Sequence, residues 1–199
     1  MERTYAVVDF ETGGFKPEEN AITEIGLVVY DKNFNEIDSY QSYITPYDDN
    51  LTYSQEALDI TDLSMEKIID EGKTIKEVAS DLELLLKKYK RPLFVAHNAQ
   101  FDYQWLPHFK QYGKKELKNK FDQNTMCTLV LSRLAFPNKN KHTLGAMCEE
   151  FEIELDNAHS ALFDVRATGE LLAKLVTKMR GTVVTDEVTI EQVKKDFKL

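Results

Sequence analysis

The segment Tyr5-Ala6-Val7-Val8-Asp9-Phe10-Glu11-Thr12 carries the strongest structural signal in this chain. Its first four residues form a continuous apolar run that predicts a buried strand, and Asp9 interrupts that run. Because side chains alternate along a strand, Asp9 and Glu11 leave the same face about 7 Å apart. Two adjacent carboxylates raise each other's pKa unless a divalent cation neutralises them, and oxygen ligands favour Mg²⁺ or Mn²⁺. The alternative is a strand end with two solvated acids.

A second acidic position follows another predicted strand. The apolar run Pro92-Leu93-Phe94-Val95-Ala96 leads through His97-Asn98 into apolar residues at helical spacing, which places Asp102 in the first turn of a helix. Open α/β sheets bind ligands at such strand ends. A charge that complements the helix dipole is the alternative for Asp102, and Asn98 is equally a candidate N-cap. Phe101 fits either core packing or stacking on a base.

The third segment supplies a candidate for proton transfer. His159 lies at or just before the start of a predicted helix, and Asp164 follows on the same helix. A core face is predicted for this helix from its apolar positions, which are Ala161, Leu162, Val165, Leu171, Leu172 and Leu175. A histidine with a pKa near neutrality accepts a proton from water at working pH. Without companion motifs, the pattern at His159 is more typical of a hydrogen-bonded structural histidine or a solvated one.

Together these segments resemble the DEDD-type 3′→5′ exonucleases, in the branch with histidine in its third motif (DEDDh), which includes the epsilon proofreading subunit of bacterial replicative polymerases. The match consists of Asp9-Phe10-Glu11-Thr12-Gly13, Asn98-Ala99-Gln100-Phe101-Asp102, and His159 with Asp164. It covers most of residues 4–176. Two departures, Asp59 where glycine is usual and Gly14 after Gly13 where threonine-glycine is common, leave every metal ligand in place.

The resemblance implies hydrolysis of phosphodiester bonds with two divalent ions, Mg²⁺ or Mn²⁺. Asp9 would bridge the two ions, and Glu11 with Asp164 would complete the site that holds the nucleophilic water. Asp102 would support the second ion, and His159 would accept the proton of the water. These five residues are the predicted catalytic residues.

Four further residues are predicted to bind the terminal nucleotide, namely Thr12, Gly13, Asn98 and Phe101. The expected substrate is the 3′ end of a nucleic acid, preferably single-stranded DNA, in DNA replication or proofreading with a DNA polymerase or replisome partner. One alternative is an exoribonuclease or a phosphodiesterase of short oligonucleotides. Another is a nucleic-acid or polymerase-binding module that keeps the fold without turnover.

The composition bears on the cellular location of the protein, and its net charge bears on how it binds nucleic acid. The chain has 34 acidic and 25 basic residues, a net charge of −9, which is the wrong sign for binding along many phosphates. A small footprint on the 3′ end is therefore expected. The lysines at 110–120, with Lys139 and Lys141, either flank the point where a nucleic-acid strand enters the site or form a solvated face. No apolar run predicts a membrane span or signal peptide, and Cys127 and Cys148 fit reduced thiols, so a cytoplasmic location is expected.

The order of the predicted elements indicates an α/β fold. Strands are expected near 5–10, 22–30 and 37–45, with a turn at 31–35. Thr74 and Glu77 form a capping box ahead of an amphipathic helix. Further helices are expected at about 125–135 and 143–151, and the last helix is expected to end near 179, before a short extended piece at 182–185 and a small helix at 189–197. The resemblance implies a ribonuclease H-like mixed sheet of about five strands flanked by helices, with an exonuclease domain at 1–180 and a short C-terminal appendage at 181–199.

Overall fold

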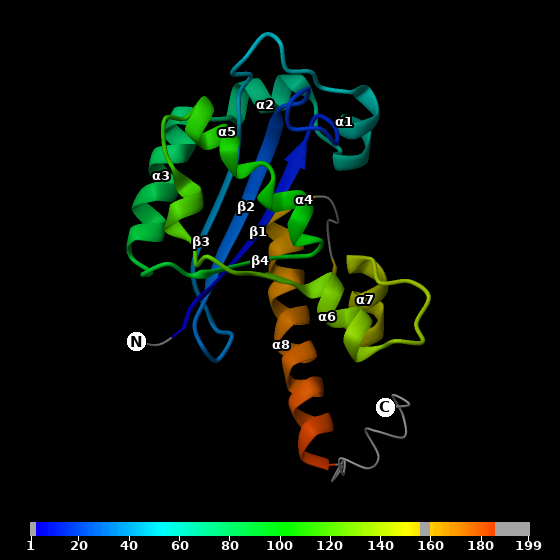
Figure 1. Ribbon diagram of the computed structural model, residues 1–199. Coiled ribbons are helices and arrows are strands. Elements are labelled where there is room, and N and C mark those ends of the chain that lie inside the picture. Colours follow the sequence, from blue (N-terminus) through cyan, green and yellow to red (C-terminus); the bar gives the residue numbers. More distant parts are fainter. Residues whose placement is uncertain (1–2, 156–159, 186–199) are drawn as a thin grey trace.

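Five strands form one mixed sheet at the centre of the molecule (Figure 1). The computed structural model describes residues 3–155 and 160–185, with side chains up to residue 181. The strands lie in the order β3-β2-β1-β4-β5. Their bounds are Tyr5–Thr12 for β1, Ile22–Tyr30 for β2, Glu36–Tyr43 for β3, Leu93–Ala96 for β4 and Thr125–Cys127 for β5. Because β1 pairs antiparallel with β2 and parallel with β4, the strand with Asp9 and Glu11 lies in the middle of the sheet.

Helices cover both faces of the sheet, which confirms the predicted α/β class (Figure 1). The described helices are α1 (Gln55–Thr61), α2 (Met65–Glu71), α3 (Ile75–Lys87), α4 (Ala99–Tyr103), α5 (Leu106–Gln111), a 3₁₀ turn (Leu117–Lys120), α6 (Thr128–Ala135), α7 (Leu144–Phe151) and α8 (Ala161–Thr185). The capping box of α3 is present, since Thr74 and Glu77 bond reciprocally to each other's backbone N–H groups. The turn at 31–35 is also confirmed, because the Asp31 carboxylate accepts from the backbone of Asn33 and Asn35.

Three predicted features are wrong. The helix expected over 125–135 begins at Thr128, because residues 125–127 pair with β4 as the parallel edge strand β5. The long helix does not end near 179, and the extended piece expected at 182–185 is helical, because α8 continues through Thr185. Once a helix has formed, each added residue brings a further backbone hydrogen bond, so propagation tolerates Gly181. The small helix expected at 189–197 lies outside the described residues.

The alternation of β1 divides the core into two layers. Ala6, Val8 and Phe10 pack in a cluster with side chains of α3 and α5. Val7 points to the other face, where it packs with Val165 and Leu172 of α8. Asp9 and Glu11 have the same parity as Val7, so the period of two sends both carboxylates toward α8.

Gly26 lets the first turn of α8 approach the sheet. It lies opposite Asp9 in the β1–β2 register. A Cβ atom added at Gly26 would collide with the backbone carbonyl of Ala161, the first residue of α8. The absence of a side chain at this position therefore places the start of α8 beside Asp9.

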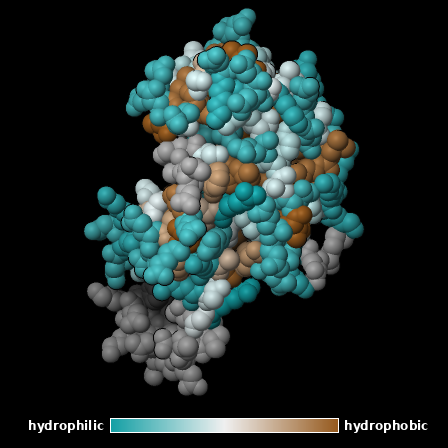
Figure 2. Space-filling view, turned by 180° about the vertical axis from the view of Figure 1, so that it is seen from behind, coloured by the Kyte–Doolittle hydropathy of each residue, from teal (hydrophilic) through white to brown (hydrophobic). Residues whose placement is uncertain are grey.

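The surface seen from behind is mostly hydrophilic, with hydrophobic side chains in separate groups (Figure 2). Within the described part of the chain, no helix is both long and apolar enough to cross a membrane. Both cysteines are free thiols; Cys148 is buried and Cys127 is half-buried.

Candidate active site

Three carboxylates meet between β1 and the first turn of α8. Asp9 and Glu11 come from β1, and Asp164 lies one turn into α8. One ligand oxygen from each of the three lies within 4.8 Å of the other two. The sequence separates Asp164 from Asp9 by most of the chain, and the packing of α8 on β1 brings them together. The predicted convergence of these three acids is therefore observed.

Burial and mutual repulsion shift the protonation of this cluster. Burial first, then the charges of Asp164 and Glu24, raise the pKa of Asp9 to about 8. Burial and the charge of Asp9 raise the pKa of Glu11 to about 9. Such shifts disfavour three carboxylates without a counter-charge at neutral pH. An all-oxygen donor set of this kind fits a hard divalent cation such as Mg²⁺ or Mn²⁺.

Asp102 reaches the same region from the other side of β1. It lies in the first turn of α4, just after β4, and only 2% of it is exposed. Its Oδ1 accepts a hydrogen bond from the backbone N–H of Phe10 at 3.3 Å. Burial, followed by the charge of Asp9, raises its pKa. Asp102 does not belong to the set of three within 4.8 Å, so it adjoins this cluster as a separate acid.

Glu24 is a fifth acid, which the sequence reasoning missed. It lies opposite Glu11 on β2 and is 1% exposed. Its carboxylate accepts from Gln41 Nε2 at 2.5 Å and from the backbone N–H of Ala161. Glu24 therefore ties the start of α8 to the sheet and orients the helix that carries Asp164. The signal that found Asp9, an acid within an apolar strand, was present here as well.

The loop after β1 brings an aromatic pair to the site. Phe15 is 77% exposed, and its ring meets that of Phe101 edge-to-face with centroids 6.4 Å apart. Phe101 also contacts Trp105 and packs against the core, which shows the first of the two roles that the sequence left open, while stacking on a base stays a prediction. The sequence reasoning did not select Phe15. An exposed phenylalanine in contact with Phe101, the sequence neighbour of Asp102, offers a flat apolar face to a ligand.

His108 anchors this loop from α5. The carbonyl of Pro17 only accepts, so His108 Nε2–H donates to it at 2.8 Å. Burial lowers the pKa of His108, which favours the neutral ring. In the neutral ring Nδ1 accepts from the Tyr47 hydroxyl at 2.7 Å, and that hydroxyl accepts from the backbone N–H of Ile22. His108 therefore holds Pro17, two residues beyond Phe15, in place.

The other predicted substrate-binding residues have defined environments. The Thr12 hydroxyl donates to the carbonyl of Gly14 at 2.6 Å, and the Gly13 N–H donates to Ala21. Gly13 packs so closely on the backbone of Thr52 that a Cβ atom would collide with it. Asn98 occupies the N-cap position of α4 with a φ of 74°, and its side chain makes no capping hydrogen bond. Binding of substrate by Thr12, Gly13, Asn98 and Phe101 stays a prediction.

His159 lies outside the described residues, in the segment 156–159. The described part of α8 begins at Ala161, directly after Ser160. Its sequence neighbour Ser160 accepts a hydrogen bond from Gln41 Nε2 at 3.3 Å, the same amide that bonds Glu24. The role of His159 as general base stays a prediction.

Comparison with known proteins identifies the family. A family model described as Exonuclease (RNase_T) matches residues 6–172. The chain belongs to this exonuclease family. The matched residues contain all four acids of the predicted motifs. Membership confirms the resemblance to the DEDD-type exonucleases.

Two curated relatives illustrate how this exonuclease domain occurs elsewhere. The chain is 30% identical over 180 residues to the PolC-type DNA polymerase III of Bacillus cereus, covering 88% of this chain and 11% of the polymerase. It is 30% identical over 195 residues to the 3′-5′ exonuclease DinG of Staphylococcus epidermidis, covering 98% of this chain and 20% of DinG. The chain therefore spans a fifth or less of the length of these two relatives.

Solved structures with the same fold include E. coli exonuclease I in complex with a dT13 oligonucleotide. Its TM-score is 0.78 at 20% identity, over 91% of this chain and 42% of that one. A second structure, the zinc-bound complex of the same enzyme with single-stranded DNA, also has a TM-score of 0.78, at 21% identity. These similarities confirm the predicted ribonuclease H-like sheet flanked by helices.

Proposed function

We propose that this chain is a metal-dependent 3′→5′ exonuclease that hydrolyses phosphodiester bonds from the 3′ end of nucleic acid, preferably single-stranded DNA. The observation that carries the proposal is the cluster of Asp9, Glu11 and Asp164, whose oxygens lie within 4.8 Å of one another in a chain of the exonuclease family. The raised pKa values of Asp9 and Glu11 add support, since a bound cation would relieve them.

Each residue has a distinct task in this proposal. Asp9, Glu11 and Asp164 hold the divalent ions, and Asp102 supports them from the opposite side of β1. Bound divalent ions supply an activated water and stabilise charge on the attacking and leaving oxygens. His159 accepts the proton of that water, which assigns the chain to the DEDDh branch. The backbone near Thr12 and Gly13, with Asn98 and Phe101, contacts the terminal nucleotide.

The preference for DNA rests on the relatives. The oligonucleotide in the exonuclease I complex is DNA, and the PolC-type relatives are DNA polymerases. The PolC-type relatives also support a role in replication or proofreading beside a DNA polymerase. The cytoplasmic location stays a prediction. Co-purification of the chain with a replicative polymerase tests that partner, and its failure at micromolar concentrations would count against it. An exoribonuclease and a phosphodiesterase of short oligonucleotides are the alternatives that share this chemistry.

The experiment that tests this function is a time course on matched 5′-labelled single-stranded DNA and RNA. A ladder that shortens from the 3′ end with Mg²⁺ or Mn²⁺, and stops with EDTA, is the expected result. The faster ladder identifies the preferred sugar. If folded, metal-bound protein shortens neither substrate, the binding-module alternative replaces this proposal.

The rate of hydrolysis is expected to fall as the pH drops through the pKa of His159, because only the neutral ring accepts a proton. Rates at saturating substrate from pH 5.5 to 8 measure this effect. His159→Gln should lower the rate at pH 8 by about 10²-fold or more and remove the acidic limb. A wild-type profile that stays flat while chemistry limits the rate would contradict the role of His159.

Phe15→Ala is expected to raise KM about tenfold with little change in kcat, because base stacking on an aromatic ring is worth about 1–3 kcal/mol. Steady-state kinetics on a single-stranded oligonucleotide measure this effect. Phe15→Trp should keep KM near the wild-type value, and Leu84→Ala, which removes another exposed apolar side chain (63% exposed), is the matched control. Equal KM values for Phe15→Ala and wild type would exclude a contact between Phe15 and the substrate.

A further inference from the structure

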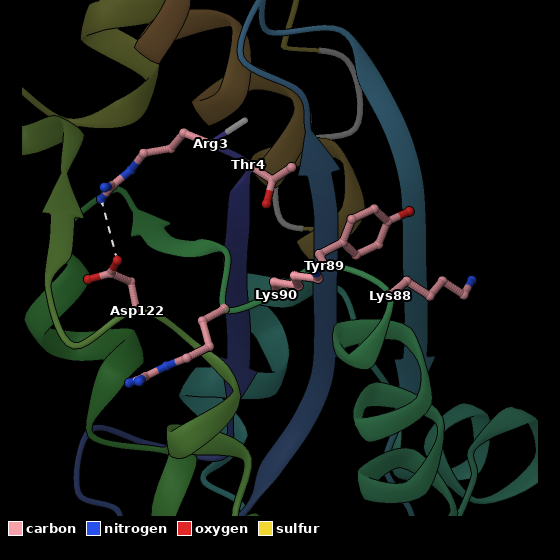
Figure 3. Close-up of a pocket in the computed structure, with 7 residues that line it drawn as sticks. Arg3, Thr4, Lys88, Tyr89, Lys90 and Asp122 are labelled. Carbon is pink, nitrogen blue, oxygen red and sulfur yellow. Dashed lines mark ion pairs between the residues drawn. The ribbon is translucent and has the colours of Figure 1, made fainter. Parts of the chain in front are cut away.

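A basic pocket lies at the start of β1, at the opposite end of that strand from the acids (Figure 3). Its volume is about 380 Å³. The residues that line it are Arg3, Thr4, Lys88, Tyr89, Lys90, Arg91 and Asp122. Figure 3 shows Arg3 facing Asp122 across one side of this pocket. The lining therefore has four basic side chains and one acid, in a chain whose net charge is −9.

Four of the seven lysines that the sequence suggested as flanking the entry of a nucleic-acid strand form ion pairs. Lys110 pairs with Glu116 at 2.6 Å, and Lys115 and Lys120 share Glu83. Lys139 pairs with Glu150 at 2.8 Å. An ammonium already paired with a carboxylate has less charge to offer a phosphate. Nucleic acid therefore gains little from these four lysines.

The basic pocket also has basic side chains outside ion pairs. Arg3 pairs with Asp122 at 3.7 Å, and Lys88 pairs with Asp38 at 2.8 Å. Among the described residues 3–155 and 160–185, Lys90 and Arg91 form no ion pair within 4.0 Å, although the charge of Arg91 helps to lower the pKa of Asp122. Four cations in the pocket thus face one lining acid, Asp122.

Arg91 is held in place by its backbone and by its side chain. Its φ of 61° lies in the left-handed region, which costs a non-glycine residue about 1–2 kcal/mol. Its Nε donates to the carbonyl of Phe121 at 2.9 Å. This hydrogen bond occupies one edge of the guanidinium and leaves the terminal N–H groups for an anion. A guanidinium fixed in this way loses little conformational entropy when it binds a phosphate.

We propose that this pocket binds phosphate groups of the nucleic-acid strand whose 3′ end occupies the acid site, an inference that rests on the proposed function. Tyr5 and Glu11 are six residues apart on β1, so the basic pocket and the acid site lie about 20 Å apart along this β-strand. At the rise of about 3.4 Å per nucleotide of a base-stacked strand, this distance corresponds to about six nucleotides, and a more extended single strand covers it with fewer. A trinucleotide cannot reach the pocket from the acid site, whereas a 20-mer can.

The test measures binding without hydrolysis, by fluorescence anisotropy in EDTA with labelled dT3 and dT20. The variant combines Lys90→Ala with Arg91→Gly, because glycine adopts the left-handed conformation of residue 91 without strain. Lys90→Ala alone is included in case the double variant folds poorly. The matched control is Lys76→Ala with Lys114→Gly, since both lysines line another pocket of about 410 Å³ and residue 114 also has a left-handed φ, of 59°. Thermal unfolding verifies that all variants are folded.

We expect the double variant to weaken dT20 binding about tenfold at 50 mM salt and to leave dT3 binding unchanged. Two lost phosphate contacts should also reduce the slope of log K against log salt by about 1.4. An equal loss for dT3 and dT20, or a loss no larger than in the control, would overturn the proposal. Binding of dTMP is the last outcome to examine. If the wild-type protein binds dTMP, the double variant does not, and strand length has no effect, the pocket binds free nucleotides. That outcome would overturn the assignment of the pocket to a nucleic-acid strand.

This experiment separates the pocket from the proposed function. Because no metal is present, strand binding is measured whether or not the chain hydrolyses its ligand. A protein that loses dT20 binding in the double variant, yet never shortens a strand, would support the pocket and reject the exonuclease activity.

Discussion

Replacing Asp9 with alanine is expected to lower kcat by at least about 10³-fold, which corresponds to about 4 kcal/mol of transition-state stabilisation. Asp9 lies at the centre of the acidic cluster, because its charge raises the pKa of both Glu11 and Asp102. In the proposed function, its removal would take away the carboxylate that the divalent ions are expected to share. Single-turnover hydrolysis of a 5′-labelled oligonucleotide measures the loss, and calorimetric titration with Mn²⁺ measures the weaker metal binding.

Misfolding would not explain the expected loss. Because Asp9 is half-buried and the charges of Asp164 and Glu24 raise its pKa, its removal should raise the Tm of the metal-free protein at pH 8. Asp70→Ala, which removes an exposed acid of α2, should leave kcat unchanged. Wild-type turnover in Asp9→Ala would refute the assignment of the metal site to this cluster.

Metal-free protein is expected to lose stability as the pH rises from 5 to 9, by at least about 1 kcal/mol, or several degrees in Tm. The folded-state pKa values of Asp9 and Glu11 are raised to about 8 and about 9. The unfolded chain releases these protons near pH 4, so the folded state holds more protons between pH 4 and 9. The stabilisation from protonated carboxyl groups is therefore complete at low pH and is lost as the pH passes through the folded pKa values.

Thermal unfolding in EDTA and in Mg²⁺ across this pH range measures the effect. Added Mg²⁺ should raise the Tm more at pH 8.5 than at pH 5.5, because the ion binds the ionised carboxylates. Asp9→Asn should flatten the pH dependence in EDTA. If the Tm in EDTA is the same at pH 5.5 and 8.5, the cluster is less buried than its geometry indicates.

Local patterns in the sequence determined the individual elements and the acids that they carry. The period of two in β1 placed Asp9 and Glu11 on one face, and the capping box at Thr74 placed the start of α3. These features depend on residues within a few positions of one another, so they are readable without the fold. Asp102 was likewise located from the strand that precedes it.

Tertiary structure alone decided which distant residues meet. Residues 125–127 form a strand because β4 offers a parallel partner, although the local pattern favours helix. Asp164 reaches Asp9 because Gly26 admits the start of α8, and Glu24 fixes that start through Ala161. The hydrogen bonds of His108 join residues 91 positions apart in the chain. Such long-range contacts depend on packing and on pairing across the sheet, which no local period encodes.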